Sequence, residues 1–297
     1  MLPTSMPKGS TAGRLFAEAD ARANEPFEKV PPLGGGVEHG MIRELWTYRE
    51  LAYFLAWRDI KVRYKQTVLG VLWAVIQPFF TMVVFVLLFG QLAKIPTDGI
   101  PGPIFYFSAL VPWTYFSGTV SNAGMSLVAN SGLLTKIYFP RIILPASVAL
   151  SNLVDFLIGS VLFIGFMAYY GIPLGWNLLL WPALVILLVL LSLSLGLFLA
   201  ALNVKYRDFR YAIPFAIQLL LFATPIIYPA SMIPERFRWL VALNPLSGLV
   251  EAFRYSIVPS RAIDWGLLWF SIAFTVVLFF AGVAYFKSAE KAFADIV

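Results

Sequence analysis

Residues 58–78 read RDIKVRYKQTVLGVLWAVIQP, and the character of this stretch changes near Leu69. Four cations precede that point, set among apolar side chains: Arg58, Lys61, Arg63 and Lys65. An apolar run follows and continues to about Ala93. A basic, amphipathic segment lies along a membrane surface, because its cations sit near anionic headgroups while its apolar face enters the acyl boundary. A long apolar run has to cross the bilayer. We therefore expect a helix on the cytoplasmic membrane surface that leads into the first membrane span.

This amphipathic interface helix is expected over residues 42–66. Apolar side chains recur at helical spacing along it: Ile42, Leu45, Tyr48 and Leu55. The aromatic residues that suit an interfacial depth are Trp46, Tyr53 and Trp57. Two interpretations stay open, namely a generic membrane anchor and a helix that also faces a cytoplasmic partner.

The composition of the whole chain is that of an integral membrane protein. Hydrophobic residues make up 60% of it and charged residues only 13%, whereas charged residues are about 25% of a soluble domain. The net charge of +6 reflects cations beside apolar runs, which indicates membrane topology rather than nucleic-acid binding. The absence of cysteine excludes disulfides, iron–sulfur clusters and thiolate metal sites. The one histidine, His39, excludes a multi-histidine metal site within the chain.

Six apolar runs predict six transmembrane helices and hence an all-α polytopic membrane protein. The runs are Leu69–Ala93, Ile104–Met125, Ile142–Tyr170, Leu178–Val204, Ala212–Tyr228 and Leu267–Phe286. Most reach the roughly 20 residues that a helix needs to cross the hydrocarbon core. Helices are expected because lipid offers backbone groups no external hydrogen-bond partner. Residues 67–297 are therefore the membrane domain, and the Pro- and Gly-rich residues 1–41 are expected to be a flexible cytoplasmic tail.

The cations in the connections predict the orientation. Those on one side are Lys136 and Arg141 before the third run, Lys205, Arg207 and Arg210 before the fifth, and Lys287 and Lys291 after the sixth. On the other side, Lys94 is balanced by Asp98, and Gly171–Asn177 carries no charge. Because cytoplasmic loops carry an excess of Lys and Arg, both termini and the second and fourth connections are expected in the cytoplasm.

The segment Pro229–Gly266 precedes the last run and is expected on the outer side. Its apolar middle is long enough for a seventh span, but Asn244 and Pro245 break the helix near the centre. Glu251 and Arg254 argue against contact with lipid, because each charge costs a few kcal/mol at mid-bilayer. They are three residues apart, so on a helix they can pair. We therefore expect a re-entrant helical pair that enters the outer leaflet and turns back.

The sequence contains no phosphate-binding Walker loop, no nucleophile elbow and no pair of acids at catalytic spacing. If the chain moves a substrate, the energy comes from another protein. The cytoplasmic segment Leu133–Pro145, LLTKIYFPRIILP, is short, basic, aromatic and bounded by prolines. It suits either a partner's groove or an ordinary positive-inside loop, and residue chemistry alone favours the ordinary loop.

Four stretches resemble the permease subunits of ABC polysaccharide exporters, a family that moves lipid-linked O-antigen, capsule or teichoic-acid chains. The entry to the first span, Arg58–Pro78, is similar to the family signature, and YFPRIILP resembles its coupling segment. Asn203–Pro234 is similar to the fourth connection and fifth span, and LNPLSGLVEAFRY, Leu243–Tyr255, resembles the segment before the last span. The resemblance covers about residues 45–287 in the same order. One departure is Ile142, where many relatives have an acidic residue.

The resemblance implies a homodimer of six-span permease subunits in the bacterial inner membrane, with two ATP-binding-cassette ATPase subunits docked on the cytoplasmic side. ATP and Mg²⁺ would bind to those partners, and no cofactor is expected on this chain. The residues expected to couple the chain to the ATPase are Thr135, Lys136, Tyr138, Phe139, Pro140 and Arg141, together with Arg58 and Arg63 of the interface helix. The re-entrant residues Asn244, Pro245, Glu251 and Arg254 would lie near the external exit.

A sugar polymer needs a wide path, and aromatic faces suit sugar CH groups while Tyr and Trp also donate hydrogen bonds. Candidates for that path are Trp73, Phe79, Phe80, Trp113, Tyr115, Phe116 and Tyr228. Trp and Tyr also gather at bilayer interfaces whatever the substrate, so fewer than half of these are expected to line it. Asp155 is the one acid well inside a span, where either substrate contact or hydrogen bonding with Asn152 would account for it.

The sequence is therefore interpreted as the permease of an ATP-driven exporter of a lipid-linked, O-antigen-like polysaccharide, and not as an enzyme. Export of teichoic acid or capsule is the alternative within the family. A membrane-embedded enzyme that processes glycans or lipids would need a cluster of acids, histidines or metal ligands at one membrane face. A secondary transporter would be expected to show internal symmetry or several intramembrane carboxylates.

Overall fold

The computed structural model describes most of the unit Met41–Val297. The residues that it describes are 46–65, 70–134, 136, 139–173, 175–206, 208–257 and 263–290. The predicted tail, residues 1–41, and the joint near Leu69 lie outside these ranges, as do Thr135 and Tyr138 of the predicted coupling segment. Within the described ranges the secondary structure is entirely helical, which confirms the all-α prediction.

The helices follow one another through short connections. In chain order they are α3 (Arg49–Lys65), α4 (Leu72–Phe85), η1 (Val86–Leu92), α5 (Gly102–Ala129), α6 (Ser131–Leu134), α7 (Ile143–Tyr169), η2 (Trp176–Leu180), α8 (Trp181–Lys205), α9 (Phe209–Ala223), η3 (Ala230–Met232), η4 (Glu235–Phe237), α10 (Arg238–Ala242), α11 (Pro245–Tyr255) and α12 (Trp265–Glu290).

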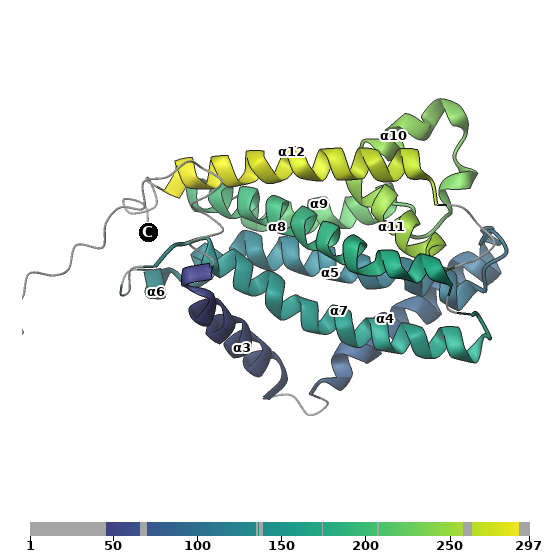
Figure 1. Ribbon diagram of the computed structural model, residues 1–297, viewed down its shortest axis with the longest axis horizontal. Helices are drawn as coiled ribbons and strands as arrows, with labels where there is room; N and C mark the ends of the chain where they lie inside the picture. The colour runs from purple at the N-terminus through teal and green to yellow at the C-terminus, as the bar shows by residue number, and fades with distance from the viewer. Residues whose placement is uncertain are drawn as a thin grey trace, which may run out of the picture. The chain divides into compact units, whose positions relative to one another are not determined.

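The helix α5 lies at the centre of the bundle and packs against both α7 and α8, while α12 packs on the other side of α8 (Figure 1). Most side chains of α5 between Ile104 and Phe116 are buried. Small residues bring the neighbouring helices close, because a Cβ atom on Gly196 of α8 would lie 2.8 Å from that of Ala123. These contacts make α5, α7, α8 and α12 the packed centre on which the other helices rest.

Among the helices in the described ranges, four are long and apolar enough to cross a membrane. They are α4 with η1, α7, η2 with α8, and α12. The remaining two predicted spans take a different form. The helix α5 is 28 residues long but carries many polar side chains, and α9 is apolar but has only 15 residues.

Two departures from the predicted runs have local causes. The fifth run was expected to stay helical to Tyr228, but α9 ends at Ala223 because Thr224 precedes Pro225 and takes an extended conformation. In the first run, α4 changes into the π-helix η1 at Val86. A π-helix has no signature in the hydropathy of a sequence, because the pattern of apolar residues does not change.

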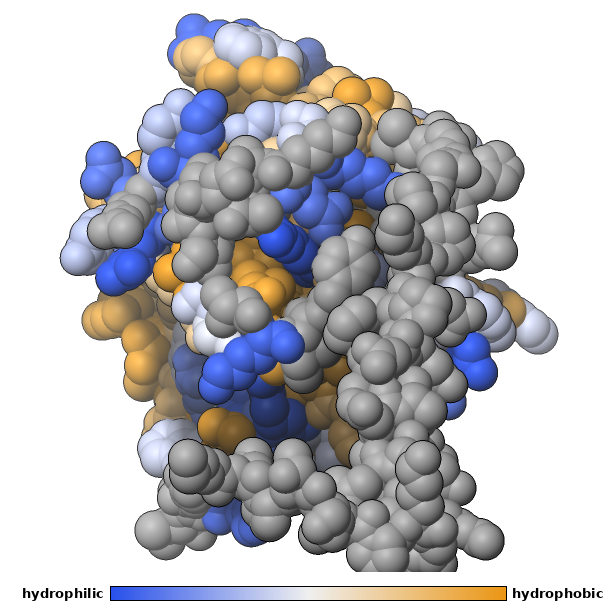
Figure 2. All heavy atoms as spheres, turned by 90° about the vertical axis from the view of Figure 1, so that its left-hand side faces the viewer, coloured by the Kyte–Doolittle hydropathy of each residue, from blue (hydrophilic) through white to orange (hydrophobic). Residues whose placement is uncertain are grey.

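The connections gather at two opposite ends of the bundle. At the first, which we call the basic end, lie residues 130–134 and 139–141, the end of α8, the start of α9 and the end of α12, where Arg141 contacts Glu290. Hydrophilic side chains gather on this end in Figure 2. At the second, the far end, lie the connection before α5, the start of α8 and the end of α11, where Trp181 donates to Ser256 and Tyr255 donates to Asp98.

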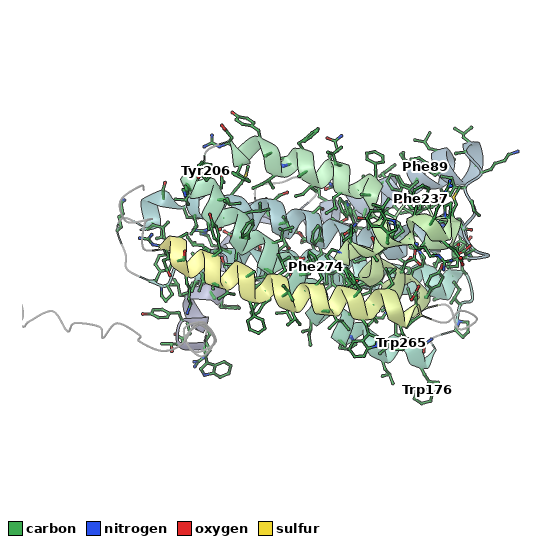
Figure 3. The ribbon with its side chains drawn as sticks, turned by 90° about the horizontal axis from the view of Figure 1, so that it is seen from above. Phe89, Trp176, Tyr206, Phe237, Trp265 and Phe274 are labelled. Carbon is green, nitrogen blue, oxygen red and sulfur yellow. The ribbon has the colours of Figure 1, made fainter. Side chains whose placement is uncertain are left out.

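Exposed aromatic side chains mark both ends. Figure 3 shows Trp176 and Trp265 at the far end and Tyr206 at the basic end, and all three are exposed. Aromatic side chains of this kind concentrate where a membrane meets water. Their separation along the bundle therefore agrees with helices that run from one interface to the other.

The helix α3 packs against α7. Its buried side chains are Ala52, Leu55 and Ala56, whereas Phe54 and Trp57 on other faces are exposed. Small buried side chains allow a close approach but remove little apolar surface from solvent, so α3 is attached to the bundle less firmly than the central helices.

The apolar stretch before α12 is broken where the sequence predicts. The helix α10 ends at Ala242 and α11 begins at Pro245, whose fixed φ suits the first helical turn. Asn244 caps α11 by accepting from the Leu246 N–H at 3.1 Å, and its amide donates to Thr224 Oγ1 at 2.8 Å. The break therefore also ties α11 to the end of α9.

The close approach of α11 to α12 generates a prediction about stability. A Cβ atom on Gly248 would lie 2.5 Å from the Leu267 carbonyl oxygen and 2.3 Å from Ser271 Oγ. Gly248→Ala should cost about 1–3 kcal/mol, as overpacking does, and lower the midpoint of thermal unfolding in detergent by several degrees. Gly165→Ala in α7 is the matched control, because no described atom lies within 4 Å of that position. Equal midpoints for the two variants would contradict the packing described.

Candidate functional site

Two neighbouring side chains near the end of α3, Arg63 and Tyr64, reach the middle of the bundle. Arg63 follows Ala52 and Ala56 at helical spacing and so lies on the buried face of α3. The surface helix therefore directs a cation at α7 and not only toward headgroups.

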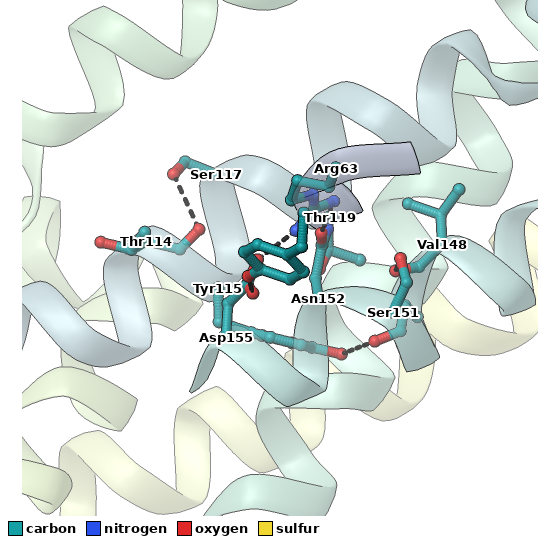
Figure 4. A network of polar contacts seen from close by, with 11 residues as sticks. Arg63, Thr114, Tyr115, Ser117, Thr119, Val148, Ser151, Asn152 and Asp155 are labelled. Carbon is teal, nitrogen blue, oxygen red and sulfur yellow. Dashed lines mark hydrogen bonds and ion pairs between the residues drawn. The ribbon is translucent and has the colours of Figure 1, made fainter. Parts of the chain in front are cut away.

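On α7, Asn152 and Asp155 are three residues apart and share one face of the helix. One guanidinium nitrogen of Arg63 forms an ion pair with the Asp155 carboxylate, and the other donates to Asn152 Oδ1 at 2.8 Å. The Asn152 amide donates in turn to Thr119 Oγ1 of α5 at 3.2 Å. We call these residues, with Tyr64, the Arg63 network; it joins α3, α7 and α5 (Figure 4).

Tyr64 adds a second contact to the same carboxylate, because its hydroxyl donates to Asp155 Oδ1. Partial burial, followed by this hydrogen bond, raises the pKa of Tyr64 to about 12. The hydroxyl therefore stays protonated at physiological pH and remains a donor to Asp155.

The Arg63 network is only partly shielded from solvent. The side chains of Arg63 and Asp155 are 34% and 26% exposed. Exposed ion pairs contribute about 0.2–1 kcal/mol, whereas breaking a buried pair costs about 3–5 kcal/mol. A pair of intermediate exposure holds α3 in place, yet it can be broken and reformed at modest cost.

A cavity of about 300 Å³ lies beside the network. Arg63 of α3, Trp73 and Gln77 of α4, and Asn152 and Asp155 of α7 all contribute to its lining. The polar side of α5 completes the wall with Thr114, Ser117 and Asn122. The network thus forms part of the wall of a mostly uncharged cavity between four helices, whose lining combines these polar groups with apolar side chains such as Val111 and Phe156.

At the basic end, α3 also contacts the segment that leads to α7. Arg58 pairs with Asp59 and donates to Asn130 Oδ1, just beyond the end of α5, at 3.1 Å. In the following segment, Lys136 is exposed, while Arg141 donates through its backbone and side chain to Glu290. Phe139 is buried, and Pro140 next to it is partly buried. Of the predicted coupling cations, Lys136 and Arg58 are exposed, and Arg63 and Arg141 are partly buried.

At the far end, Glu251 and Arg254 of α11 form an ion pair, with 2.7 Å between Oε1 and Nη1 and both side chains buried. Arg254 also donates to the Ile226 carbonyl at 3.2 Å, and its guanidinium carbon lies 3.8 Å from the centroid of the Phe105 ring. The Glu251 carboxylate accepts from the Ala230 N–H at 3.1 Å. One buried pair therefore holds together α11, α5 and the segment after α9.

Asp98 extends this arrangement into the connection before α5. Its carboxylate accepts from the Tyr255 hydroxyl at 2.8 Å and from Ser231 Oγ at 2.9 and 3.0 Å. The far end is thereby fixed by contacts between four separate parts of the chain.

The aromatic residues predicted to line a path occupy three kinds of place. Trp73 and Tyr115 line the cavity, and Trp73 is half exposed while Tyr115 is buried and donates to the Ala149 carbonyl. Trp113 and Phe116 are buried in the core. The others are Phe79, partly buried and stacked on Phe166, Phe80, exposed, and Tyr228, which donates to the Phe222 carbonyl at the end of α9.

Reasoning from the sequence missed the pairing of Arg63 with Asp155. It assigned Arg63 to a partner protein and considered Asn152 or substrate as the contact of Asp155. The two residues are 92 positions apart, and no local spacing connects them. An acid inside a span with a cation on the adjoining surface helix was the one available signal, because intramembrane acids generally have a partner.

Known proteins similar to this chain share its family and most of its length. The sequence profile of the ABC-2 type transporter family matches residues 50–258. The O-antigen export system permease protein RfbA of Myxococcus xanthus is 34% identical over 258 residues, which cover 86% of this chain and 98% of that protein. A permease of the same name from Klebsiella pneumoniae is 28% identical, covering 81% and 92%. The polysialic acid transport protein KpsM of Escherichia coli is 26% identical, covering 79% and 92%.

The Arg63 network predicts how firmly α3 is held. The chain has no cysteine, so a single introduced thiol reports on one position. Leu55→Cys, on the buried face of α3, should react slowly with a polar maleimide. Asp155→Asn should raise that rate about five-fold, since a hydrogen-bonded charge in this setting contributes about 1 kcal/mol. Phe54→Cys is exposed and is the control, with one rate in both backgrounds. A Leu55→Cys rate that Asp155→Asn leaves unchanged would show that the pair does not hold α3.

The buried far-end pair predicts a different response. Glu251→Leu alone leaves Arg254 buried without its carboxylate and should destabilise the protein by about 3–5 kcal/mol, as should Arg254→Met. The double variant removes both charges and should be closer to the parent than either single variant. The midpoint of thermal unfolding in detergent measures all three. Additive losses in the double variant would contradict direct coupling between the two side chains.

Proposed function

The chain belongs to the ABC-2 type transporter family, and from this premise we propose that it is the permease subunit of an ATP-driven exporter of lipid-linked polysaccharide. The observation that carries the proposal is the 34% identity to an O-antigen export permease across 98% of that relative's length. A match of this extent covers most of the chain and not one shared motif.

We propose six membrane spans, formed by the four long apolar helices together with α5 and α9. Two features support α5 as a span, namely its 28 residues and its place between α7 and α8. We propose that the basic end and both termini lie in the cytoplasm, and the excess of Lys and Arg at that end supports this orientation. The membrane is then the bacterial inner membrane, and α10 and α11 form the re-entrant pair on its outer side.

The transported chain is proposed to be a surface glycan of the O-antigen kind. Two of the relatives named above are O-antigen export permeases. A capsule-like polymer is the second candidate, because the name of the KpsM relative gives polysialic acid as its cargo. Teichoic acid stays a third possibility within the family that the sequence resembles.

We propose that separate ATPase subunits, which bind ATP and Mg²⁺, dock at the basic end and drive transport from there. Lys136 is exposed there, and Arg58 links α3 to Asn130 just before the coupling segment. A partner that displaces this end would pull on α3, and the Arg63 network carries that displacement to α7 and the cavity wall. We infer that α3 separates from α7 at this network during each transport cycle.

A homodimer completes the proposed transporter, with the path for the polymer between two copies of the chain. The exposed face of α4 supports this arrangement, because Trp73 and Phe80 are uncovered in the single chain. Two permeases and two ATPase subunits would then form one exporter.

The division of labour between permease and ATPase gives the first test. The purified chain should hydrolyse no ATP, and hydrolysis should appear when the separate ATPase subunit is added in proteoliposomes. Export of lipid-linked glycan into the vesicles should require both proteins and ATP. ATP hydrolysis, glycosyl transfer or transport by this chain alone would sink the proposal and favour an enzyme or a secondary transporter.

Coupling at the basic end gives the second test. Lys136→Glu places a negative charge where the partner is expected, so export should fall at least ten-fold while the thermal unfolding midpoint stays unchanged. Lys94→Glu is the matched control, because Lys94 is also exposed but lies in the connection at the far end. Equal export by the two variants would show that Lys136 is a topology signal and not a coupling residue.

A further inference from the structure

Polar side chains occupy an exposed face of α4 and α5. Gln77 of α4 and Asn122 of α5 are exposed, and both line the 300 Å³ cavity beside the Arg63 network. Thr114 and Ser117 lie on the same side of α5, close to each other in Figure 4. Polar groups that face lipid lose their hydrogen bonds to water at a cost of several kcal/mol. This face is therefore suited to contact something other than lipid.

The hydrogen-bonding capacity of the face is largely unused. The side-chain amides of Gln77 and Asn122 bond to no other group in the described part of the chain. The hydroxyls of Thr114 and Ser117 donate to the carbonyls of Leu110 and Thr114, which leaves their oxygen lone pairs as acceptors. The cavity thus presents two amides, each a donor and an acceptor, and two further acceptors.

The charge of the lining decides which ligand suits the cavity. Among its described lining residues Arg63 is the one cation, and Asp155 is the one acid. They neutralise each other, and the second guanidinium nitrogen of Arg63 already donates to Asn152. A phosphate would meet no uncommitted cation among these residues, and Asp155 would repel it. A neutral ligand rich in hydroxyl groups fits the available amides and hydroxyls.

The ring of Trp73 also suits a neutral ligand rich in hydroxyl groups. Trp73 lines the cavity and is half exposed, so part of its ring is open to a ligand. Aromatic rings offer an apolar face to the CH groups of a ring-shaped ligand, and the indole N–H is a further donor. The volume of about 300 Å³ is at the lower limit of ligand pockets, which suits a short part of a polymer.

We propose that this cavity is a binding subsite for an uncharged sugar residue of the exported glycan. Gln77 and Asn122 hydrogen-bond its hydroxyl groups, and Trp73 packs against its ring. The inference rests on the proposed function and extends it: the subsite contacts the sugar and not the phosphate that joins a glycan to its lipid. Because Arg63 and Asp155 form part of the wall, separation of α3 from α7 would change the shape of the subsite.

Binding of a soluble glycan tests the proposal directly. The probe is an oligosaccharide of the host's own O-polysaccharide, released from its lipid and without phosphate, and inorganic pyrophosphate is the second arm. The receptor is the full-length chain with its ATPase subunit in nanodiscs. The oligosaccharide should bind and change tryptophan fluorescence, and Trp73→Phe should abolish most of that change. If pyrophosphate binds and the oligosaccharide does not, the assignment of the cavity to a sugar is overturned.

Two near-isosteric substitutions remove the amides with little change in volume. Gln77→Met together with Asn122→Leu should weaken oligosaccharide binding about ten-fold or more, since two hydrogen bonds are lost, and export should fall with it. Gln91→Met is the control, because Gln91 is exposed in η1 but does not line the cavity. Thermal unfolding of each variant confirms that it is folded, and if the double variant is not, Trp73→Phe alone supplies the binding comparison.

The outcomes separate this inference from the proposed function. If the parent protein exports glycan with ATP but the double variant binds and exports equally well, the subsite is overturned while the function stands. If the double variant separates the two permease copies, the polar face is a contact between copies and the subsite is again overturned. If the parent does not export with ATP and its partner, the proposed function itself fails.

Discussion

The ion pair between the Arg63 guanidinium and the Asp155 carboxylate is the contact on which the position of α3 and the charge of the neighbouring cavity depend. It holds the end of α3 against α7, and through Asn152 and Thr119 it reaches α5. Without it, α3 would rest on the small buried side chains Ala52, Leu55 and Ala56, which remove little apolar area from solvent. The two charges of this pair also cancel each other in the wall of the cavity. The pair therefore determines both the position of α3 and the net charge that a ligand meets.

A comparison of the two ion pairs shows which end of the molecule is rigid and which can move. Glu251 and Arg254 are buried, and the guanidinium also contacts a ring and a carbonyl. Removing one partner there leaves an uncompensated buried charge, which the fold tolerates poorly. Arg63 and Asp155 are partly exposed, so water can take over their hydrogen bonds when they separate. The far end therefore serves as a fixed frame, and the contact between α3 and α7 is where displacement by a partner costs little.

Most of the helices could be predicted from the sequence, because apolar runs and prolines determine where a helix forms and ends from residues close in the chain. The break at Asn244 and Pro245 and the pairing of Glu251 with Arg254 follow from neighbours in the chain, and the structure contains both. The π-helix at Val86 was not predicted, because it changes hydrogen bonding without changing hydropathy. The Arg63 network could not be predicted either, nor could the amides of Gln77 and Asn122, which bond to no other group in the part of the chain that the structure describes. Both arise only when α3, α4, α5 and α7 come together. The local pattern thus predicts elements, while the cavity and its charge balance depend on contacts distant in sequence.

Cross-linking α3 to α7 tests most directly whether these helices separate during transport. The chain has no cysteine, so Leu55→Cys of α3 and Ala149→Cys of α7, which belong to one buried cluster, leave the Arg63 network intact. A short bismaleimide with a reducible disulfide can join the two thiols, and the cross-linked and reduced forms of one preparation can be compared. We expect the cross-linked form to lose ATP-dependent export of glycan in proteoliposomes and to regain it on reduction. Export at the same rate in both forms would contradict the separation of α3 from α7 and, with it, the transmission of force through the Arg63 network.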